Sequence, residues 1–519
     1  MIDSSIMYQV YPLSFKDSNG DGHGDILGII EKLDYLKDLG VDAIWLSPVF
    51  KSPMKDFGYD ISDYYAIDPL FGTMEDFEKL IKEAHDRNIK VLLDYVANHT
   101  SSEHPWFQES KKSPDNTKRN WYVWRNGKGP GIPPNNWISA FGGSSWEYDP
   151  ATDEWYLHDF LKEQPDLNWR NPEVKKAMID IFTFYLDKGV DGYRMDAMAF
   201  LFEDETYPDD PKNAHYNSQK EIPWYTLKRK YDFNQPEVLP LLHELTEVAS
   251  RFGNKLLISE IYDSLETLGK LYFRKNDTTH IPFNFDLMTL EWNADVFKNY
   301  LESYLKVVGD NIPNFVLSNH DQPRVATRVG QEKARLLAFL QLTLPGIAVI
   351  YYGDEIGMKN IPLPADQIKD PLGKLVDRRF GRDSERSPMQ WNTASFAGFS
   401  STQPWLPVEA DYKQRNVDIF LKKEDSILQL YKNLISLRKS GPALLHGNLS
   451  SIEVQSHTVL SFQRKTDVET LSIKLNFSNQ PQKIILDRAY KILFSSHARE
   501  KGISTTNLEL YPYEGILLK

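Results

Sequence analysis

The sequence predicts an α/β protein: a (β/α)8 TIM barrel with an inserted loop-rich subdomain after the third strand and a C-terminal antiparallel β domain. Three observations support this fold class. Short β-rich runs alternate with amphipathic helical stretches, which is typical of βα units around a parallel sheet. There are eight such runs, the number that closes a barrel of this type. A chain of 519 residues is also too long for one small core.

The expected barrel strands are short, apolar and rich in β-branched and aromatic residues. Between them lie helical segments with an apolar stripe at the helical period, at residues 27–40, 74–88 and 174–189. We expect the eight strands within residues 6–15, 41–49, 89–99, 190–198, 255–262, 280–286, 314–321 and 348–357.

Two segments depart from this alternation. Residues 100–166 hold little helical periodicity but many Trp, Gly, Pro and Asn, which predicts a subdomain built mainly of loops. Near the end, alternating runs such as "TVLSFQRK" and "LSIKLNFS" predict a small antiparallel domain. The predicted domains are therefore the barrel (1–99 and 167–440), the insert or domain B (100–166) and a C-terminal β-sandwich (441–519).

Composition excludes several classes of protein. The chain has 60 Lys and Arg against 73 Asp and Glu, and this net negative charge repels nucleic acid. It has no cysteine, so disulfides, thiolate metal sites and a cysteine nucleophile are excluded. No run approaches the roughly 18 apolar residues that span a bilayer, and "MIDSSIMYQV" lacks the pattern of a secretory signal. We expect a soluble, cytoplasmic protein without membrane partners; its oligomeric state is left open.

Four of the predicted strands end in polar clusters: "DYVANH", "GYRMD", "ISE" and "SNHD". In a barrel of this type the catalytic groups come from the C-terminal ends of the strands. A single carboxylate at such a place is more often a helix cap or a turn former. Several together are costly to desolvate, which favours a functional site. The convergent set is Asp94, Asp196, Glu260 and Asp321, with His99, Arg194 and His320.

Convergent carboxylates suggest glycoside cleavage, in which one attacks the anomeric carbon and another protonates the leaving oxygen. Arg194 and Asp196 share one face of their strand, so Arg194 would hold Asp196 ionised, as a nucleophile requires. Glu260 must instead keep its proton near neutral pH, through burial or a neighbouring negative charge.

The same four clusters resemble, in order and spacing, the signature regions of glycoside hydrolase family 13, the α-amylase family. "QPDLNWRNP", "YYGDEIGM" and "GRDSERSPMQW" are similar to its oligo-1,6-glucosidase and α-glucosidase branch. The resemblance covers roughly residues 6–400 and implies a retaining enzyme. It makes Asp196 the nucleophile, Glu260 the general acid and base, and Asp321 the carboxylate that stabilises the transition state.

The resemblance also assigns substrate-binding residues. Arg194 would orient Asp196, while His99 and His320 would bind sugar hydroxyls around the cleaved bond. In "MKDFGYD", Tyr59 would stack on the terminal sugar, although Phe57 stands where relatives often have Asn. Asp56 and Arg382 would bind the terminal 4-hydroxyl and close the site beyond one glucose, which implies an exo-acting α-glucosidase.

The residue after the nucleophile bears on linkage. In the resembling branch this position tends to be Val in α-1,6-cleaving enzymes and Ala or Thr in α-1,4-cleaving ones, so Ala197 predicts α-1,4 preference. The motif "QPDLNW" also occurs in relatives that cleave α-1,6 bonds, so it favours α-1,6 preference. An oligo-1,6-glucosidase, a transglucosylase and a sugar isomerase of the same family stay open. A non-catalytic sugar-binding relative should lack one of the three carboxylates, and this chain has all three.

The loop "DSNGDGHGD" contains a second pattern. Asp17, Asn19 and Asp21 occupy every second position before a glycine, like the opening of an EF-hand calcium loop. Asp25 and the backbone carbonyl of His23 would complete the shell, although the twelfth position is a glycine instead of the usual Glu. The alternative is an ordinary polar βα loop. Similar loops of the resembling branch bind calcium, which implies a structural Ca²⁺; the sequence leaves Ca²⁺ or Mg²⁺ open.

Overall fold

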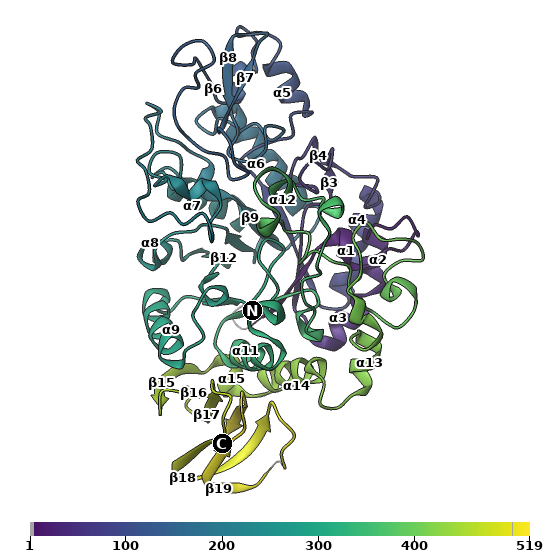
Figure 1. The fold of residues 1–519 in the computed structure, drawn as a ribbon, viewed down its shortest axis with the longest axis vertical. Coiled ribbons are helices and arrows are strands. Elements are labelled where there is room, and N and C mark those ends of the chain that lie inside the picture. The colour runs from purple at the N-terminus through teal and green to yellow at the C-terminus, as the bar shows by residue number, and fades with distance from the viewer. Residues whose placement is uncertain (1–4, 501) are drawn as a thin grey trace.

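The structure is a computed structural model that describes residues 5–500 and 502–519, and its centre is a parallel barrel wrapped by helices (Figure 1). All eight expected strands are present in the described chain, so the barrel prediction is confirmed. An additional strand, β11 (Phe273–Lys275), pairs antiparallel with β12. The barrel strands are β1 (Ile6–Val10), β2 (Ala43–Leu46), β5 (Lys90–Val96), β9 (Gly192–Asp196), β10 (Leu256–Ser259), β12 (Thr278–Pro282), β13 (Asn314–Val316) and β14 (Ile347–Tyr351).

Backbone ladders join the barrel strands in parallel in the order β12-β10-β9-β5-β2-β1-β14-β13. Between β12 and β13, one buried side chain forms two hydrogen bonds. Asn314 donates from Nδ2 to the carbonyl of Pro282 at 2.7 Å, and its Oδ1 accepts from the backbone of Asn284 at 2.9 Å. Asn314, the first residue of β13, thus ties the start of this strand to Pro282, the last residue of β12.

The helices outside the barrel follow the expected periodicity, as α4 (Met74–Asp86) illustrates. Thr73 and Asp76 form a capping box at its start. Its buried residues are Phe77, Leu80, Ile81 and Ala84, spaced to form one stripe against the sheet.

The helix expected at residues 27–40 is divided in two. It forms α2 (Ile26–Glu31) and α3 (Leu33–Leu39), because Lys32 leaves the helical region with φ −105° and ψ 2°. Gly40 ends α3 with a positive φ of 94°, a conformation that suits glycine. The remaining long helices of the described chain are α6 (Pro172–Asp187), α7 (Val238–Ser250), α9 (Ala294–Val308), α11 (Gln331–Thr343) and α14 (Ile427–Ser440).

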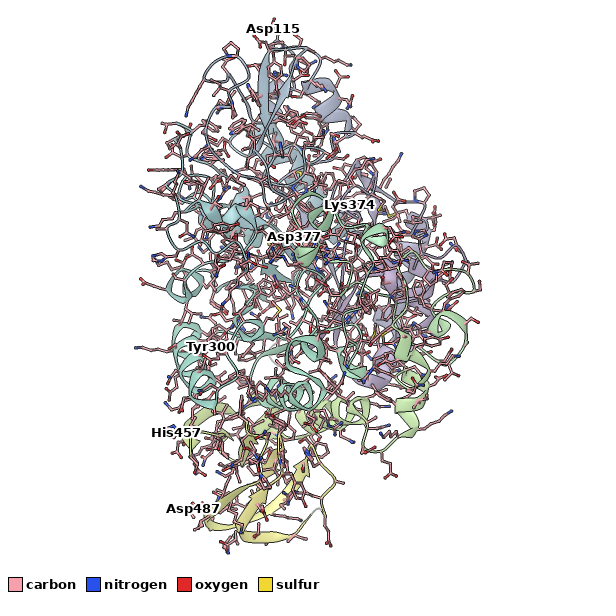
Figure 2. The ribbon with its side chains drawn as sticks, viewed as in Figure 1. Asp115, Tyr300, Lys374, Asp377, His457 and Asp487 are labelled. Atoms are coloured by element: carbon pink, nitrogen blue, oxygen red, sulfur yellow. The ribbon has the colours of Figure 1, made fainter. Side chains whose placement is uncertain are left out.

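The insert and the C-terminal domain lie at opposite ends of the molecule, marked by Asp115 and Asp487 (Figure 2). The insert contains α5 (Pro105–Ser110) and a small antiparallel sheet of β6 (Trp124–Arg125), β8 (Glu154–Leu157) and β7 (Trp146–Asp149). The C-terminal strands form one continuous six-stranded sheet in the order β15-β16-β17-β20-β18-β19, which confirms the antiparallel domain. The finer expectation of a β-sandwich stays a prediction. They are β15 (Asn448–Gln455), β16 (Val459–Lys465), β17 (Thr470–Asn476), β18 (Gln482–Ser495), β19 (Ser504–Leu510) and β20 (Gly515–Leu518).

Two expectations from the sequence concern membranes and targeting. Within the described ranges, every helix is too short or too polar to cross a membrane. Residues 1–4, which open the segment expected to lack a secretory signal, lie outside the described residues.

Candidate active site

The carboxyl ends of three neighbouring strands meet at one arginine. Arg194 on β9 is in register with Asp94 on β5, and its Nη1 lies 2.6 Å from Asp94 Oδ1. The same Nη1 lies 2.5 Å from Asp196 Oδ1, and Nη2 pairs with Glu260, which follows β10. The Arg194 side chain is only 2% exposed. The charged residues of β9 therefore form the centre of a buried network.

Burial and charge act in opposite directions on these carboxyls. Burial raises the pKa of Asp196 well above its usual value, while the Arg194 guanidinium lowers it. The pKa of Asp94 is raised to about 6, again by burial and against Arg194. The ion pair expected from the sequence is present, but burial outweighs it. Ionisation of Asp196 consequently depends on its contact with Arg194.

Asp321 has the opposite electrostatic environment. Its Oδ1 lies 3.1 Å from Arg382 Nη1 and 2.9 Å from Arg386 Nη2, and its Oδ2 lies 3.2 Å from His320 Nε2. Although burial works to raise it, the pKa of Asp321 is lowered by His320, Arg382 and Arg386. Asp321 is therefore ionised at neutral pH, beside the Asp196 and Glu260 pair.

An ion-pair network around Arg382 lies beside Asp321 in the wall of the site. Arg382 Nη2 lies 2.8 Å from Asp56 Oδ1 and 2.7 Å from Asp370 Oδ1. The Asp56 carboxylate also accepts from Gln164 Nε2 at 3.2 Å. Gln164 Nε2 in turn lies 3.0 Å from His99 Nε2, and burial lowers the pKa of His99 to about 4, so this imidazole is neutral at pH 7.

Tyr59 links Asp94 to His320. Its hydroxyl donates to Asp94 Oδ2 at 3.0 Å and lies 2.7 Å from His320 Nε2. Its ring stacks on His320 with an interplanar angle of 4°. The Tyr59 side chain is therefore held in one position, with its neighbours fixed on both sides.

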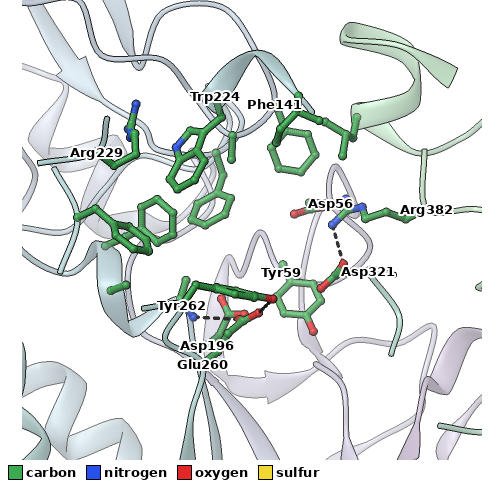
Figure 3. Close-up of a pocket in the computed structure, with 18 of the residues that line it drawn as sticks. Asp56, Tyr59, Phe141, Asp196, Trp224, Arg229, Glu260, Tyr262, Asp321 and Arg382 are labelled. Carbon is green, nitrogen blue, oxygen red and sulfur yellow. Dashed lines mark hydrogen bonds and ion pairs between the residues drawn. The ribbon is translucent and has the colours of Figure 1, made fainter. Parts of the chain in front are cut away.

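These residues line a cavity of about 460 Å³ (Figure 3). Its size is within the range of small-molecule sites. The structure brings together in its wall the predicted residues Asp56, Tyr59, His99, Asp196, Ala197, Glu260, His320, Asp321 and Arg382. Arg194 lies beneath them, hydrogen-bonded to Asp196 and Glu260.

Several residues of the site were missed from the sequence. Asp370 had no recognisable signal, whereas Gln164 begins "QPDLNWRNP" and Arg386 lies within "GRDSERSPMQW", two stretches that were quoted without a role for these residues. The aromatic lining was also missed, because it comes from segments without periodicity. These lining residues are Phe141, Phe160, Phe200, Trp224, Tyr225, Phe233 and Tyr262.

The loop at residues 17–25 is organised by its own backbone. Asp17 Oδ1 accepts from the N–H groups of Asn19 and Gly20, and its Oδ2 accepts from Gly22 and the Ser400 hydroxyl. Asp25 caps α2 by accepting from Gly28 at 2.7 Å. In the part of the chain that the structure describes, no three His, Asp or Glu side chains are grouped to hold a metal ion.

The other two acidic or amide side chains of the loop, Asn19 and Asp21, are exposed and contact each other. Asn19 Nδ2 donates to Asp21 Oδ2 at 3.2 Å, and Asp21 Oδ1 accepts from the backbone of His23 at 2.8 Å. These side chains carry oxygen atoms, which are the ligand atoms that hard cations prefer. Their chemistry fits Ca²⁺, and the site stays a prediction.

Comparisons with known proteins place this geometry among carbohydrate-active enzymes. The family model of the α-amylase catalytic domain matches residues 9–447. An oligo-1,6-glucosidase of Bacillus cereus is 38% identical over 559 residues, covering 99% of this chain and 98% of its own length. An α-glucosidase of Apis mellifera is 41% identical over 491 residues, covering 92% and 85%. The crystal structure of an α-glucosyl transfer enzyme, XgtA, matches with a TM-score of 0.92 at 36% identity, covering 100% of this chain and 99% of that one.

Proposed function

The chain belongs to the α-amylase family and is a glycoside hydrolase, and we propose that it is a retaining, exo-acting α-glucosidase that prefers α-1,4 over α-1,6 bonds. Its substrates would be short α-glucosides, from which it releases glucose at the non-reducing end. One observation carries this proposal: Asp196, Glu260 and Asp321 face one cavity whose wall also carries Arg382, ion-paired with Asp56 and Asp370.

The chemistry would proceed in two steps at the anomeric carbon. Asp196 attacks this carbon while Glu260 protonates the leaving oxygen, which gives a glucosyl ester of Asp196. Glu260 then removes a proton from water, and the water oxygen displaces Asp196 with net retention. Arg194 contacts both carboxyls and holds them in place, and the Tyr262 hydroxyl donates to Glu260 Oε1 at 3.0 Å.

Asp321, Asp56 and Arg382 would act on the sugar itself. The negative charge of Asp321 suits a transition state in which positive charge develops on the sugar ring. Asp56 and Arg382 would bind the terminal 4-hydroxyl, supported by the 2.8 Å contact between them. This pair would close the site beyond one glucose, so the substrate would enter by one glucose unit.

An NMR time course tests the stereochemical outcome. With an α-glucoside substrate, we expect α-glucose to form first and to mutarotate later. Formation of β-glucose first would show inversion and contradict the assignment of Asp196 as nucleophile.

Linkage preference rests on Ala197. The residue lines the cavity and adopts a left-handed conformation with φ 49° and ψ 33°. A β-branched residue is strained in this conformation, so alanine is favoured by the backbone as well as by space near the leaving group. We expect kcat/KM to be higher for maltose than for isomaltose by roughly tenfold to a few hundredfold, the range that one such contact supplies.

The variant Ala197→Val should narrow or reverse this ratio and also lower stability. Ala197→Gly is a matched control, because glycine removes the methyl group and suits a positive φ. A wild-type ratio in favour of isomaltose would identify an oligo-1,6-glucosidase, the activity named in the relative from Bacillus cereus.

Transfer to a sugar is the second candidate outcome. A transglucosylase or sugar isomerase would use the same glucosyl ester and pass it to a sugar hydroxyl instead of water. The 36% identity to a protein named as an α-glucosyl transfer enzyme supports keeping this candidate. Products from maltose and sucrose separate the two: free glucose indicates hydrolysis, and larger or rearranged sugars indicate transfer.

We also propose that the loop at residues 17–25 binds a structural Ca²⁺. Its ligands would be the side chains of Asp17, Asn19, Asp21 and Asp25 and the backbone carbonyl of His23. A bound cation would offset the repulsion among three carboxylates in a short loop. The cytoplasmic location is likewise a proposal, which cell fractionation would test.

A further inference from the structure

The chain contains two Asn-Gly pairs, Asn19–Gly20 and Asn126–Gly127, and neither lines the cavity. In such a pair the backbone nitrogen of the glycine can attack the side-chain amide carbon of the asparagine. The attack is easiest before glycine, because this residue has no side chain to hinder it and its backbone is the least restricted. The structure places the two pairs in different environments.

The first pair is held by hydrogen bonds at both reacting groups. The Gly20 N–H donates to Asp17 Oδ1 at 2.6 Å. Asn19 Oδ1 accepts from the backbone of Asp21 at 2.9 Å, and Asn19 Nδ2 donates to Asp21 Oδ2 at 3.2 Å. The attacking nitrogen and the amide under attack are therefore both engaged, so the reaction requires the loop to open first.

The second pair lies in the insert, directly after β6. Asn126 is exposed, and within the described residues neither its side chain nor the Gly127 N–H makes a hydrogen bond. The turn that follows is ordered without them: the Lys128 N–H donates to the Ile132 carbonyl at 3.1 Å, and the Ile132 N–H donates to the Gly129 carbonyl at 3.0 Å. This pair can therefore react without unfolding of its neighbours.

Packing requires the glycine of this second pair. A Cβ atom at Gly127 would lie 2.3 Å from the carbonyl oxygen of Ile132 and 2.7 Å from Trp155 Nε1. Any side chain would clash with the backbone at Ile132. The fold of the insert thus keeps the residue that makes Asn126 reactive.

We propose that Asn126 is a site of spontaneous deamidation, with water as the only co-reactant. A bond forms between the Gly127 backbone nitrogen and Asn126 Cγ, and the bond from Cγ to Nδ2 breaks. The proton of the attacking nitrogen leaves with the side-chain nitrogen as ammonia, and a cyclic succinimide remains. Water then adds to one of its two carbonyl carbons and opens the ring, which gives aspartate or isoaspartate without any oxidation.

Both products change the insert. Each adds a negative charge close to Lys128, whose Nζ lies 2.9 Å from Asp209 Oδ1 and so joins the insert to the segment after β9. Isoaspartate also adds one carbon to the backbone before Gly127, at the place where this glycine packs closely on Ile132 and Trp155. We expect the modified insert to be less stable, while the residues of the cavity stay in place.

The test incubates the full chain at mildly alkaline pH, where the attacking nitrogen loses its proton more readily. Peptide mapping by mass spectrometry measures conversion at Asn126 and Asn19 in the same sample. EDTA is present, so that a bound cation cannot add to the protection of Asn19. The same chain in urea gives the rate of each pair without structure. Asn217, which is exposed but followed by Ser218, is the control for the need of a glycine.

In urea the two pairs should react at similar rates. In the folded chain Asn126 should react about tenfold or more faster than Asn19, because breaking the hydrogen bonds of Asn19 and Gly20 costs at least about this factor. Asn217 should stay unmodified over the same period. The variant Asn126→Gln should not accumulate the acidic form, since its longer side chain would have to close a larger ring.

Two results would overturn the proposal. In the first, Asn19 reacts as fast as Asn126 in the folded chain. In the second, Asn126 reacts in urea but stays unmodified in the folded chain, which would show that the insert protects it. Both results leave the glucosidase assignment intact, because the pair lies outside the cavity.

Discussion

Two groups of carboxylates in this molecule are stabilised in opposite ways. Asp94, Asp196 and Glu260 at the barrel rim come from three strands and share one buried arginine. Asp17 and Asp25 in the loop at residues 17–25 accept hydrogen bonds mainly from N–H groups of their own segment.

The two environments indicate different roles for the two groups of carboxylates. Backbone N–H groups stabilise a local turn, and they do so with neighbours that are close in sequence. At the rim, like charges are buried close together, which lowers the stability of the fold. Such an arrangement is typical of a functional site. We therefore expect changes at the rim to affect catalysis and changes in the loop to affect stability.

The strongest test of this contrast is Asp196→Asn. Loss of the nucleophile should lower kcat by about 10⁴-fold or more, judged from other enzymes that lose a nucleophile. Asp115→Asn, an exposed carboxylate of the insert, serves as control and should keep wild-type kcat. Near-native activity of Asp196→Asn, measured on maltose, would show that the rim carboxylates are structural.

The second test compares the pH dependence of unfolding. Burial raises the pKa of Asp94 from 3.8 to about 6. Its contribution to stability is therefore fully present below about pH 4 and is lost as pH rises through about 6. The span corresponds to about 3 kcal/mol at most. Asp94→Asn should remove this part of the decline in melting temperature between pH 4 and 7.

Asp17 should behave in the opposite manner. Although burial works to raise it, the pKa of Asp17 is lowered by the Ser400 hydroxyl and the backbone N–H groups of Gly20 and Gly22. Its contribution is present above its usual pKa near 3.8 and is lost as pH falls below that value. Asp17→Asn should flatten only the acid side of the plot of melting temperature against pH. Identical pH curves for the two variants would erase the contrast.

A third test concerns Asp370, which was not recognised from the sequence. It holds Arg382 through Nη2 at 2.7 Å and Nε at 3.1 Å; Asp370 is fully buried and the Arg382 side chain is 12% exposed. Asp370→Asn should lower kcat/KM for maltose by about 30-fold or more, since removing one partner of a buried charge pair costs at least about 2 kcal/mol. Asp366→Asn, an exposed neighbour, is the control. An unchanged kcat/KM would remove Asp370 from the substrate-binding network.

The smallest expected effect is that of chelation. If the loop at residues 17–25 binds Ca²⁺, EDTA should lower the melting temperature by about 2 to 5 °C through loss of a ligand that binds only the folded state. The kcat of protein that remains folded should not change. A melting temperature unaffected by EDTA, together with no metal in elemental analysis, would show that the backbone alone organises this loop.

Much of the architecture was predictable because the relevant signals are local. Each barrel strand is a short buried run, and β9 and its charged residues were recognised from alternation along a few residues. The rim position of Asp196, Glu260 and Asp321 follows from their place at strand ends. The division of the predicted helix 27–40 at Lys32 was missed, since its apolar stripe continues through the break.

The sequence by itself determined the order of the elements, the residues at the strand ends and the family resemblance, because periodicity reports burial and motifs report local chemistry. Tertiary structure alone decided which charges meet. It brought Asp370 to Arg382, joined β12 to β13 through Asn314 and assembled the aromatic lining of the cavity from separate segments. It also decided the pKa of Asp196, since desolvation depends on every atom packed around the carboxyl and no short stretch of sequence encodes that surrounding.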